Sequence, residues 1–173
     1  FLNTIVTNML TFTRVSRPQF QRFDLRKMIE ETLLFFEPVF LQRNVQVVRP
    51  HTEASLIIEA DAEMLRQMLI NLLMNGLQAM SERGQLSVHV RSHDSINAEI
   101  EVEDTGIGIP EENLDKIFDP FFTTNEKGTG LGLSLVHQIV KKHNGTITAH
   151  SQFGKGTRFT VSLPLQIEGL PTC

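Results

Sequence analysis

The segment from Ala98 to Asp104 alternates between two kinds of side chain. One face of an extended chain would carry Glu99, Glu101 and Glu103, and the other would carry Ile100, Val102 and Asp104. This period predicts a half-buried strand with one wet face and one packed face. An ionised carboxylate on the packed side is costly without a partner. Asp104 therefore either caps its own loop through the amides of Thr105 and Gly106 or accepts a hydrogen bond from a ligand.

The segments around this strand alternate irregularly between helical and extended periodicity. The predicted helices are Asp24 through Phe40, Asp61 to about Ser81, and about Leu131 to His143. The first two begin at an aspartate that can cap them, and Asn144-Gly145 ends the third. The other predicted strands are Val45 to Val48, Leu56 to Ile58, Leu86 to Arg91, Thr146 to Ser151 and Thr157 to Leu163.

The order of these elements predicts the fold class. We expect an α+β fold, a two-layer sandwich with a mixed, mostly antiparallel sheet and helices on one face, and not a doubly wound parallel sheet. The strands Val45 to Val48 and Leu56 to Ile58 flank a polar stretch at His51-Thr52-Glu53 and are predicted to form a hairpin. An amphipathic helix interrupted near Arg17-Pro18 is expected from Leu2, Ile5, Val6, Met9 and Phe12.

Composition restricts the class of protein. With 173 residues, 40% of them hydrophobic and 21% charged, the chain is expected to form one globular domain with an appendage. A formal net charge of -4 argues against a nucleic-acid partner. The single cysteine, Cys173, excludes an intrachain disulfide and indicates a reducing compartment. No apolar run is long enough to span a membrane. Because the chain begins at Phe1, we expect a soluble fragment of a longer protein.

Two asparagines stand one turn apart on the second predicted helix. Asn71 and Asn75 would offer neutral oxygens to one hard cation, and magnesium takes only one or two such oxygens beside phosphates and water. The alternative is that both amide side chains simply face water on the helix surface. Gly76 costs roughly 1 kcal/mol relative to alanine within a helix, which suggests a close approach to the backbone there.

A glycine-rich turn precedes the third helix. Gly128, Gly130 and Gly132 can expose backbone N–H groups beside the positive end of the helix, which favours an anion. Such turns also occur in proteins without a ligand, and the sequence matches neither a P-loop nor a dinucleotide fingerprint. The phase of the last strand directs the hydroxyl of Thr157 to the same side as Asp104. A carboxylate and a hydroxyl together suit a ring with an amine and acceptor nitrogens, such as adenine.

Four segments occur in a specific order: NLLMNGLQAM from Asn71, DTGIGI from Asp104, IFDPFFTT from Ile117 and GTGLGLSL from Gly128. They resemble the N, G1, F and G2 boxes of the catalytic and ATP-binding domain of sensor histidine kinases, particularly the nitrogen-regulation type. That domain belongs to the Bergerat-fold superfamily, with gyrase, Hsp90 and MutL. The resemblance covers about Phe23 to Leu165. It implies that residues 1–22 end the second dimerisation helix, that residues 23–168 form the catalytic domain and that residues 169–173 form a tail.

The resemblance also implies roles for individual residues. Asn75 would ligate Mg²⁺, and Asp104 would accept from the adenine amine. Gly106 and Gly108 would shape the base pocket, and Thr157 would support the base through water. The implied ATP-binding residues are Asn75, Asp104, Gly106, Gly108, Ile109, Phe118, Thr129, Gly130, Leu131, Gly132 and Thr157. The residues expected to act in catalysis are Asn71, Asn75 and Lys127, and Phe118, Phe121 and Phe122 would anchor a lid.

The sequence departs from the family pattern at three places. Asn125 stands where lysine is frequent, so Lys127 is the nearest substitute, and Gly76 stands where alanine is usual. No histidine lies in a His-Glu-x-x-Thr-Pro setting, and His93 is the only one followed by an acid. The others, expected to be surface or packing residues, are His51, His89, His137, His143 and His150.

The chemistry of one position separates the enzymes that the resemblance allows. Gyrase-like ATPases carry a water-activating glutamate one turn before the magnesium asparagine, and here that position is Asn71, whose amide cannot act as a general base. Phosphoryl transfer from ATP to a histidine on a missing hairpin is the leading interpretation. The alternatives are a nucleotide-sensing module without transfer, a Bergerat-fold ATPase and an anti-sigma-type serine kinase.

The resemblance further implies partners and a location. The partners would be the phosphoacceptor hairpin of the same kinase and the receiver domain of a response regulator. The intact protein would be a homodimer, and the fragment a monomer or weak dimer. A cytoplasmic protein, or the cytoplasmic part of a membrane-anchored sensor, is expected.

Overall fold

The computed structural model describes residues 17–49, 55–81, 83–92, 96–125 and 128–166. The amphipathic segment from Leu2 to Phe12, the polar stretch at His51-Thr52-Glu53, His93 and Lys127 lie outside these residues. The elements are β1 (Gln21–Asp24), α2 (Leu25–Gln42), β2 (Val45–Val48), β3 (Ile57–Ala60), α3 (Ala62–Ala79), β4 (Gly84–Ser92), β5 (Asn97–Asp104), α4 (Glu111–Leu114), α5 (Gly132–Lys142), β6 (Thr146–Gln152) and β7 (Gly156–Pro164). β1 and α4 were not predicted.

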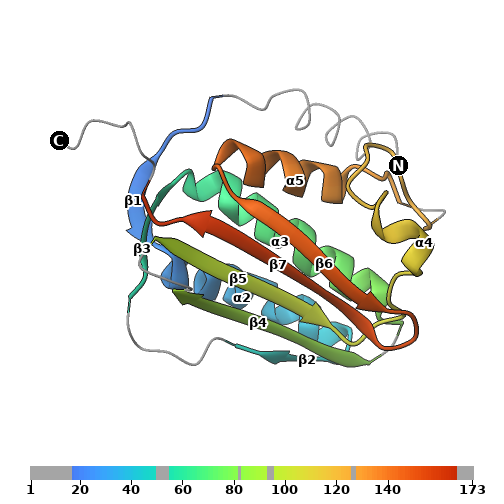
Figure 1. Cartoon of the computed structure of the whole chain (residues 1–173). Helices are drawn as coiled ribbons and strands as arrows, with labels where there is room; N and C mark the ends of the chain where they lie inside the picture. The colour runs from blue at the N-terminus through green and yellow to red at the C-terminus, as the bar shows by residue number, and fades with distance from the viewer. Residues whose placement is uncertain (1–16, 50–54, 82, 93–95, 126–127, 167–173) are drawn as a thin grey trace.

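The main sheet has five strands in the order β2-β4-β5-β7-β6. β2 runs parallel to β4, whereas the other neighbouring pairs are antiparallel. β1 and β3 form a separate antiparallel pair. Figure 1 shows α2, α3 and α5 gathered on one face of the main sheet. The expected α+β fold, with a mixed sheet and helices on one face, is confirmed.

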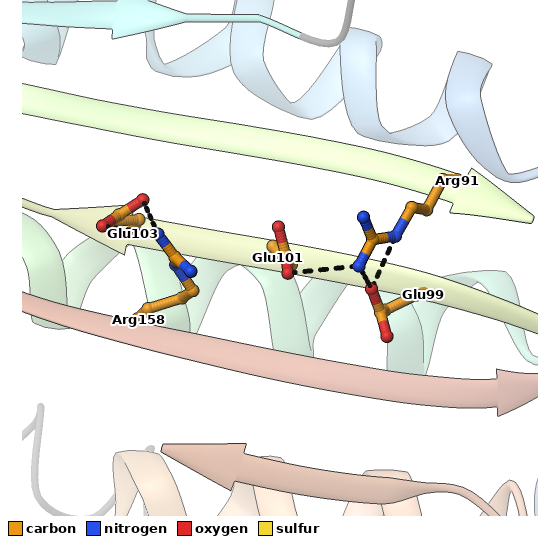
Figure 2. A network of polar contacts seen from close by, with 5 residues as sticks. All are labelled: Arg91, Glu99, Glu101, Glu103 and Arg158. Carbon is orange, nitrogen blue, oxygen red and sulfur yellow. Dashed lines mark hydrogen bonds and ion pairs between the residues drawn. The ribbon is translucent and has the colours of Figure 1, made fainter. Parts of the chain in front are cut away.

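The two faces of the sheet differ as the strand period predicts. Ile100, Val102 and Asp104 are buried beneath the helices, opposite buried residues of β4 and β7. The other face carries charged side chains in ion pairs (Figure 2). Arg91 contacts both Glu99 and Glu101, and Arg158 contacts Glu103 at 3.0 Å. Because its charged side chains can remain in water, this face needs no second layer of helices, and the helices pack on the other face only.

The two long helices begin at the predicted caps. The Asp24 carboxylate accepts from the backbone N–H groups of Arg26 and Lys27, and that of Asp61 accepts from Met64 N–H. α3 ends at Ala79, two residues before the predicted Ser81, and α5 lies within one residue of the prediction at each end. No helix in the described part of the chain is long and apolar enough to cross a membrane.

The predicted hairpin of Val45 to Val48 with Leu56 to Ile58 is wrong. β2 pairs with β4, and β3 pairs with β1, so these consecutive strands belong to different sheets. The stretch between them is longer than the two-residue turns that favour a hairpin. Sequential strands neighbour each other often but not always, and pairing with distant strands places Val45 and Ile58 in the core.

The Asp24 side chain connects two elements, which gives a test of the fold. Its Oδ1 accepts from Arg26 N–H at 3.0 Å and from Leu56 N–H at 3.2 Å. We expect Asp24→Ala to lower the free energy of unfolding by about 1–2 kcal/mol, the usual cost of losing an N-cap. Urea unfolding measures this. Asp24→Asn keeps the accepting oxygen and should lose less; equal losses would contradict the capping role.

Candidate functional site

Three parts of the chain meet at one end of the sheet. They are the end of β5 with the loop that follows, the C-terminal half of α3, and the first turn of α5, which lie toward the right of Figure 1. Gly76 on α3 faces Asp104, because a Cβ at Gly76 would lie 3.3 Å from the Asp104 Cβ. Gly132 on α5 faces Asn71, because a Cβ at Gly132 would lie 3.3 Å from the Asn71 Oδ1. The fold thus brings together residues that the sequence analysis took from three separate segments.

The Asp104 carboxylate is the buried charge of the site. Only 5% of the residue is exposed, and Oδ1 accepts from Gly106 N–H at 2.8 Å. Burial raises the pKa of this carboxyl to about 6, and hydrogen bonds from the backbone of Gly106 and Thr157 oppose that rise only in part. The loop-capping role considered from the sequence is therefore present at Gly106, whereas Thr105 N–H donates to Gln85 O at 3.1 Å instead. A carboxylate has about four lone-pair sites, so these backbone bonds leave it capacity to accept from a ligand.

The loop after Asp104 is fixed on both sides by its backbone. Ile107 N–H donates to Ala79 O at the end of α3, and Ile107 O accepts from Gly154 N–H in the β6–β7 turn. A Cβ at Gly106 would lie 2.7 Å from the Ala79 backbone. Gly108 has φ +70, and a Cβ there would lie 2.3 Å from Gln152 O. Both glycines are needed for this close packing, as expected for residues that shape the site.

Two hydroxyls lie beside this loop. Thr157 is 4% exposed and stands opposite Asp104 in the β5–β7 ladder, on the inward side as predicted. Its Oγ1 lies 2.9 Å from the Oγ of Ser151, which accepts from Ile109 N–H at 2.7 Å. Ser151 was not predicted. The signal was present, because Ser151 shares the inward phase of β6 with Ile147 and Ala149.

The α3 asparagines face the start of α5. Asn71 Nδ2 donates to Gln67 O at 2.8 Å, which ties the amide nitrogen to the helix and leaves Oδ1 toward Gly132. Both amide atoms of Asn75 lie 3.9 Å from a Cβ at Gly132. Asn75 Nδ2 is buried without a hydrogen-bond partner among the described residues. A buried polar atom without a partner is exceptional in a native fold and fits a ligand-facing position.

The first turn of α5 has the properties of an anion site. Its N-cap residue, Leu131, makes no side-chain hydrogen bond to the helix, and the first turn contains no acidic residue. Gly130 has φ +67, and a Cβ there would lie 2.4 Å from the Phe121 backbone. Phe121 N–H donates to Gly130 O at 2.9 Å. Helix N–H groups without a capping side chain, together with the helix dipole, favour a phosphate.

The phenylalanines before this turn differ in their environments. Phe118 stacks on the ring of His137, with centroids 5.6 Å apart, and packs with Phe122 against the core. Phe121 is 63% exposed and does not anchor the segment in this structure. Thr129 and Gly130 are half-buried between this segment and α5. Of the three phenylalanines expected to anchor a lid, Phe118 and Phe122 contact the core and Phe121 does not.

The described histidines agree with the expected packing and surface roles. His143 is buried at the end of α5, where Asp61 N–H donates to Nε2 and the Nδ1–H group donates to Ile139 O. Burial lowers the pKa of this imidazole. His89 and His150 are exposed. No group of three or more His, Cys, Asp or Glu side chains in the described residues could hold a metal ion.

An acceptor group at the end of β5 and an uncapped helix N-terminus beside two asparagines suit an amine-bearing nucleotide. The family model "Histidine kinase-, DNA gyrase B-, and HSP90-like ATPase" matches residues 60–167. The chain belongs to this family. Membership implies ATP binding, and the relatives below make this chain the catalytic ATP-binding domain of a sensor histidine kinase.

Two curated relatives are kinases of Escherichia coli (strain K12). The histidine-protein kinase AtoS is 37% identical over 171 residues, which covers 99% of this chain and 28% of AtoS. The sensor histidine kinase ZraS is 39% identical over 166 residues, which covers 96% of this chain and 36% of ZraS. The chain thus spans well under two thirds of the length of these relatives.

Solved structures agree with this assignment. The catalytic domain of histidine kinase ThkA superposes with a TM-score of 0.78 at 33% identity, covering 86% of this chain and 97% of that one. A second structure of ThkA, in complex with the response regulator protein TrrA, gives a TM-score of 0.80 at 31% identity and covers 95% and 47%. Because the matched ThkA domain is almost fully covered, the likeness extends over a whole catalytic domain.

The raised pKa of Asp104 predicts how base selection depends on pH. If Asp104 binds the base, the ionised carboxylate above about pH 6 would accept from the adenine amine, and below it the protonated carboxyl would also donate, which would favour the guanine carbonyl. We expect the ratio of ATP to GTP affinity to fall as the pH is lowered from 7.5 to 5.5. Calorimetry at each pH measures it, and the ratio cancels protonation of the phosphates, which both nucleotides share.

The fold should persist through this titration. Because the folded pKa of Asp104 lies above the ordinary value, its contribution to stability is greatest at low pH and declines as the pH rises through about 6. Protonation of Asp104 therefore does not unfold the domain. A constant affinity ratio across the range, with the fold intact, would contradict the assignment of Asp104 to the base.

Proposed function

We propose that this domain binds Mg-ATP and transfers the γ-phosphoryl group to a histidine presented by another part of the kinase. The main support is the chemistry of α3 beside the start of α5. From Arg66 to Ala79 this helix carries no carboxylate, and its site-facing residues are Asn71 and Asn75. An amide cannot take a proton from water, so hydrolysis lacks a general base on this helix. Transfer to a nucleophile brought in line needs positioning and charge stabilisation instead.

Asn75 fits the role of the Mg²⁺ ligand. The residue is half-buried, and both atoms of its amide lie 3.9 Å from a Cβ at Gly132. Oδ1 is the atom that would hold the cation, and the unpartnered Nδ2 is a donor that would face a phosphate oxygen. Asn71 stands one turn earlier with its oxygen toward Gly132, which lets it orient a group near the phosphates. Bound magnesium would neutralise phosphate charge there. The backbone N–H groups of Gly130, Leu131 and Gly132 would hold the phosphates, and Lys127 is the nearest cation in the sequence.

The partners follow from the same proposal. The ThkA structure contains the response regulator protein TrrA, and this chain is similar to that kinase over 95% of its own length. We infer a phosphoacceptor hairpin of the same kinase and a receiver domain as partners, with a homodimeric intact protein in the cytoplasm, where ATP is available. Residues 1–22 would end the dimerisation hairpin, residues 23–168 would form the catalytic domain, and residues 169–173 would be a tail.

A substitution at the proposed metal ligand tests the magnesium assignment. We expect Asn75→Ala to reduce the gain in ATP affinity that Mg²⁺ provides and to abolish phosphotransfer, because the phosphate charge is no longer neutralised in place. Nucleotide titrations with and without Mg²⁺ measure the gain. Asn71→Ala is the matched control one turn earlier and should reduce it less. Full magnesium dependence in Asn75→Ala would reject the role.

The chain alone should bind Mg-ATP without labelling itself. The described histidines are exposed or packed, and Asn71 replaces the base that hydrolysis needs. Incubation with radiolabelled ATP should leave this chain unlabelled, and a separately added hairpin with the acceptor histidine should become labelled slowly, since the tether no longer raises its effective concentration.

Two controls make this result decisive. A hairpin with its acceptor histidine replaced by alanine should remain unlabelled, and Asp104→Ala should abolish labelling of the intact hairpin by removing ATP binding. Binding of ATP without any labelling of the hairpin would favour a nucleotide-sensing module. Strong acid-labile labelling of the chain by itself would show that one of its own histidines is an acceptor.

A further inference from the structure

Asp104, Thr157 and Ser151 form a polar row across three strands at the end of the sheet. Asp104 pairs with Thr157 between β5 and β7, and Thr157 pairs with Ser151 between β7 and β6. All three side chains share the inward phase of their strands. Neither the resemblance nor the site described above gives Ser151 a part in binding. Its hydroxyl nevertheless has three polar neighbours within 3 Å.

The numbers of protons and lone pairs at the Ser151 hydroxyl determine which atom donates in each of its hydrogen bonds. A serine hydroxyl has one proton and two lone pairs. Gly156 O, at 2.9 Å, can only accept, so the Ser151 proton points to it. Ile109 N–H, at 2.7 Å, can only donate and occupies one lone pair. The remaining lone pair faces Thr157 Oγ1 at 2.9 Å, so Thr157 must donate its proton to Ser151.

This direction determines what Thr157 presents to the site. Because its only proton is engaged by Ser151, the hydroxyl can act there as an acceptor alone. The ionised Asp104 carboxylate beside it is also an acceptor. Two neighbouring acceptors attract an exocyclic amine, directly or through water, and leave a carbonyl oxygen without a donor. The same Ser151 hydroxyl holds Ile109 and hence the loop that contains Gly108.

We propose that Ser151 is a specificity-determining positioning residue, which fixes the Thr157 hydroxyl as an acceptor and thereby favours the adenine amine over the guanine carbonyl. This inference rests on the proposed use of the site for ATP. It assigns part of the base preference to a residue that need not touch the nucleotide. When Ser151 is removed, the Thr157 hydroxyl becomes able to rotate and donate, so the penalty against a carbonyl decreases.

The test is the ratio of ATP to GTP affinity, measured by calorimetry with Mg²⁺ on the 173-residue chain. Loss of one oriented hydrogen bond should reduce this ratio about fivefold or more in Ser151→Ala. Ser151→Thr keeps the hydroxyl and should restore the wild-type ratio. A merely structural role would weaken both nucleotides equally, so an unchanged ratio in folded Ser151→Ala would overturn the proposal.

A double-mutant cycle adds an independent measurement. Thr157→Val removes the hydroxyl that Ser151 orients and should lower the ratio, whereas Thr157→Ser should preserve it. Because the two residues act as one unit, adding Ser151→Ala to Thr157→Val should reduce the ratio no further, and additive losses would overturn the proposal. If Ser151→Ala melts below the assay temperature, Ser151→Cys, a weak acceptor of similar size, takes its place with the same expectation.

The wild-type chain separates this inference from the proposed function. Tight, ATP-selective binding with an unchanged ratio in the Ser151 variants would reject the role of Ser151 and leave the ATP site intact. If the wild-type chain binds no ATP under these conditions, the proposed function and the role of Ser151 are both rejected.

Discussion

The site depends on the buried Asp104 carboxylate. A charge removed from water needs hydrogen bonds from its surroundings, so the groups around Asp104 must lie close to it. Its pKa is raised to about 6, so the backbone bonds from Gly106 and Thr157 only partly offset the loss of water. The neighbouring glycines allow this approach. A Cβ at Gly76 would lie 2.7 Å from the Leu86 side chain, and one at Gly156, where φ is +123, would lie 1.9 Å from Asp104 O. These glycines let α3 and the start of β7 approach the end of β5 closely, beside its strand neighbours Leu86 and Thr157.

The two ends of the site have opposite electrostatic character. Asp104 and Thr157 present acceptors at the strand ends, whereas the first turn of α5 presents N–H groups and the positive end of a helix. A ligand that satisfies both ends needs an amine at one end and an anion at the other, as ATP has. The α3 asparagines lie between them and add neutral polar groups. The acidic residues of β5 lie on the outer face of the sheet instead, where Arg91 and Arg158 pair with them (Figure 2).

Local features of the fold could be predicted from the sequence, and pairing between distant segments could not. The caps at Asp24 and Asp61 and the inward phase of Asp104 depend on neighbouring residues, and each is confirmed. The hairpin was wrong because strand pairing depends on which distant strand buries an apolar face. The motifs indicated Asp104 and Asn75, but no motif marks Ser151. Its importance arises only when β6, β7 and the loop at Ile109 come together.

The two helices that form the site also contact the segment before β1, at Gln19 and Phe20. Asp61 caps α3 with one carboxylate oxygen and accepts from Gln19 N–H at 2.8 Å with the other. The ring of Phe20 lies edge-on to His143 at the end of α5, with centroids 5.3 Å apart. Because burial lowers the pKa of His143, its neutral Nε2 keeps accepting from Asp61 N–H near neutral pH. The eleven residues of α5 therefore connect Gly132 at the site to the end that contacts Phe20, and α5 packs on α3 along the way.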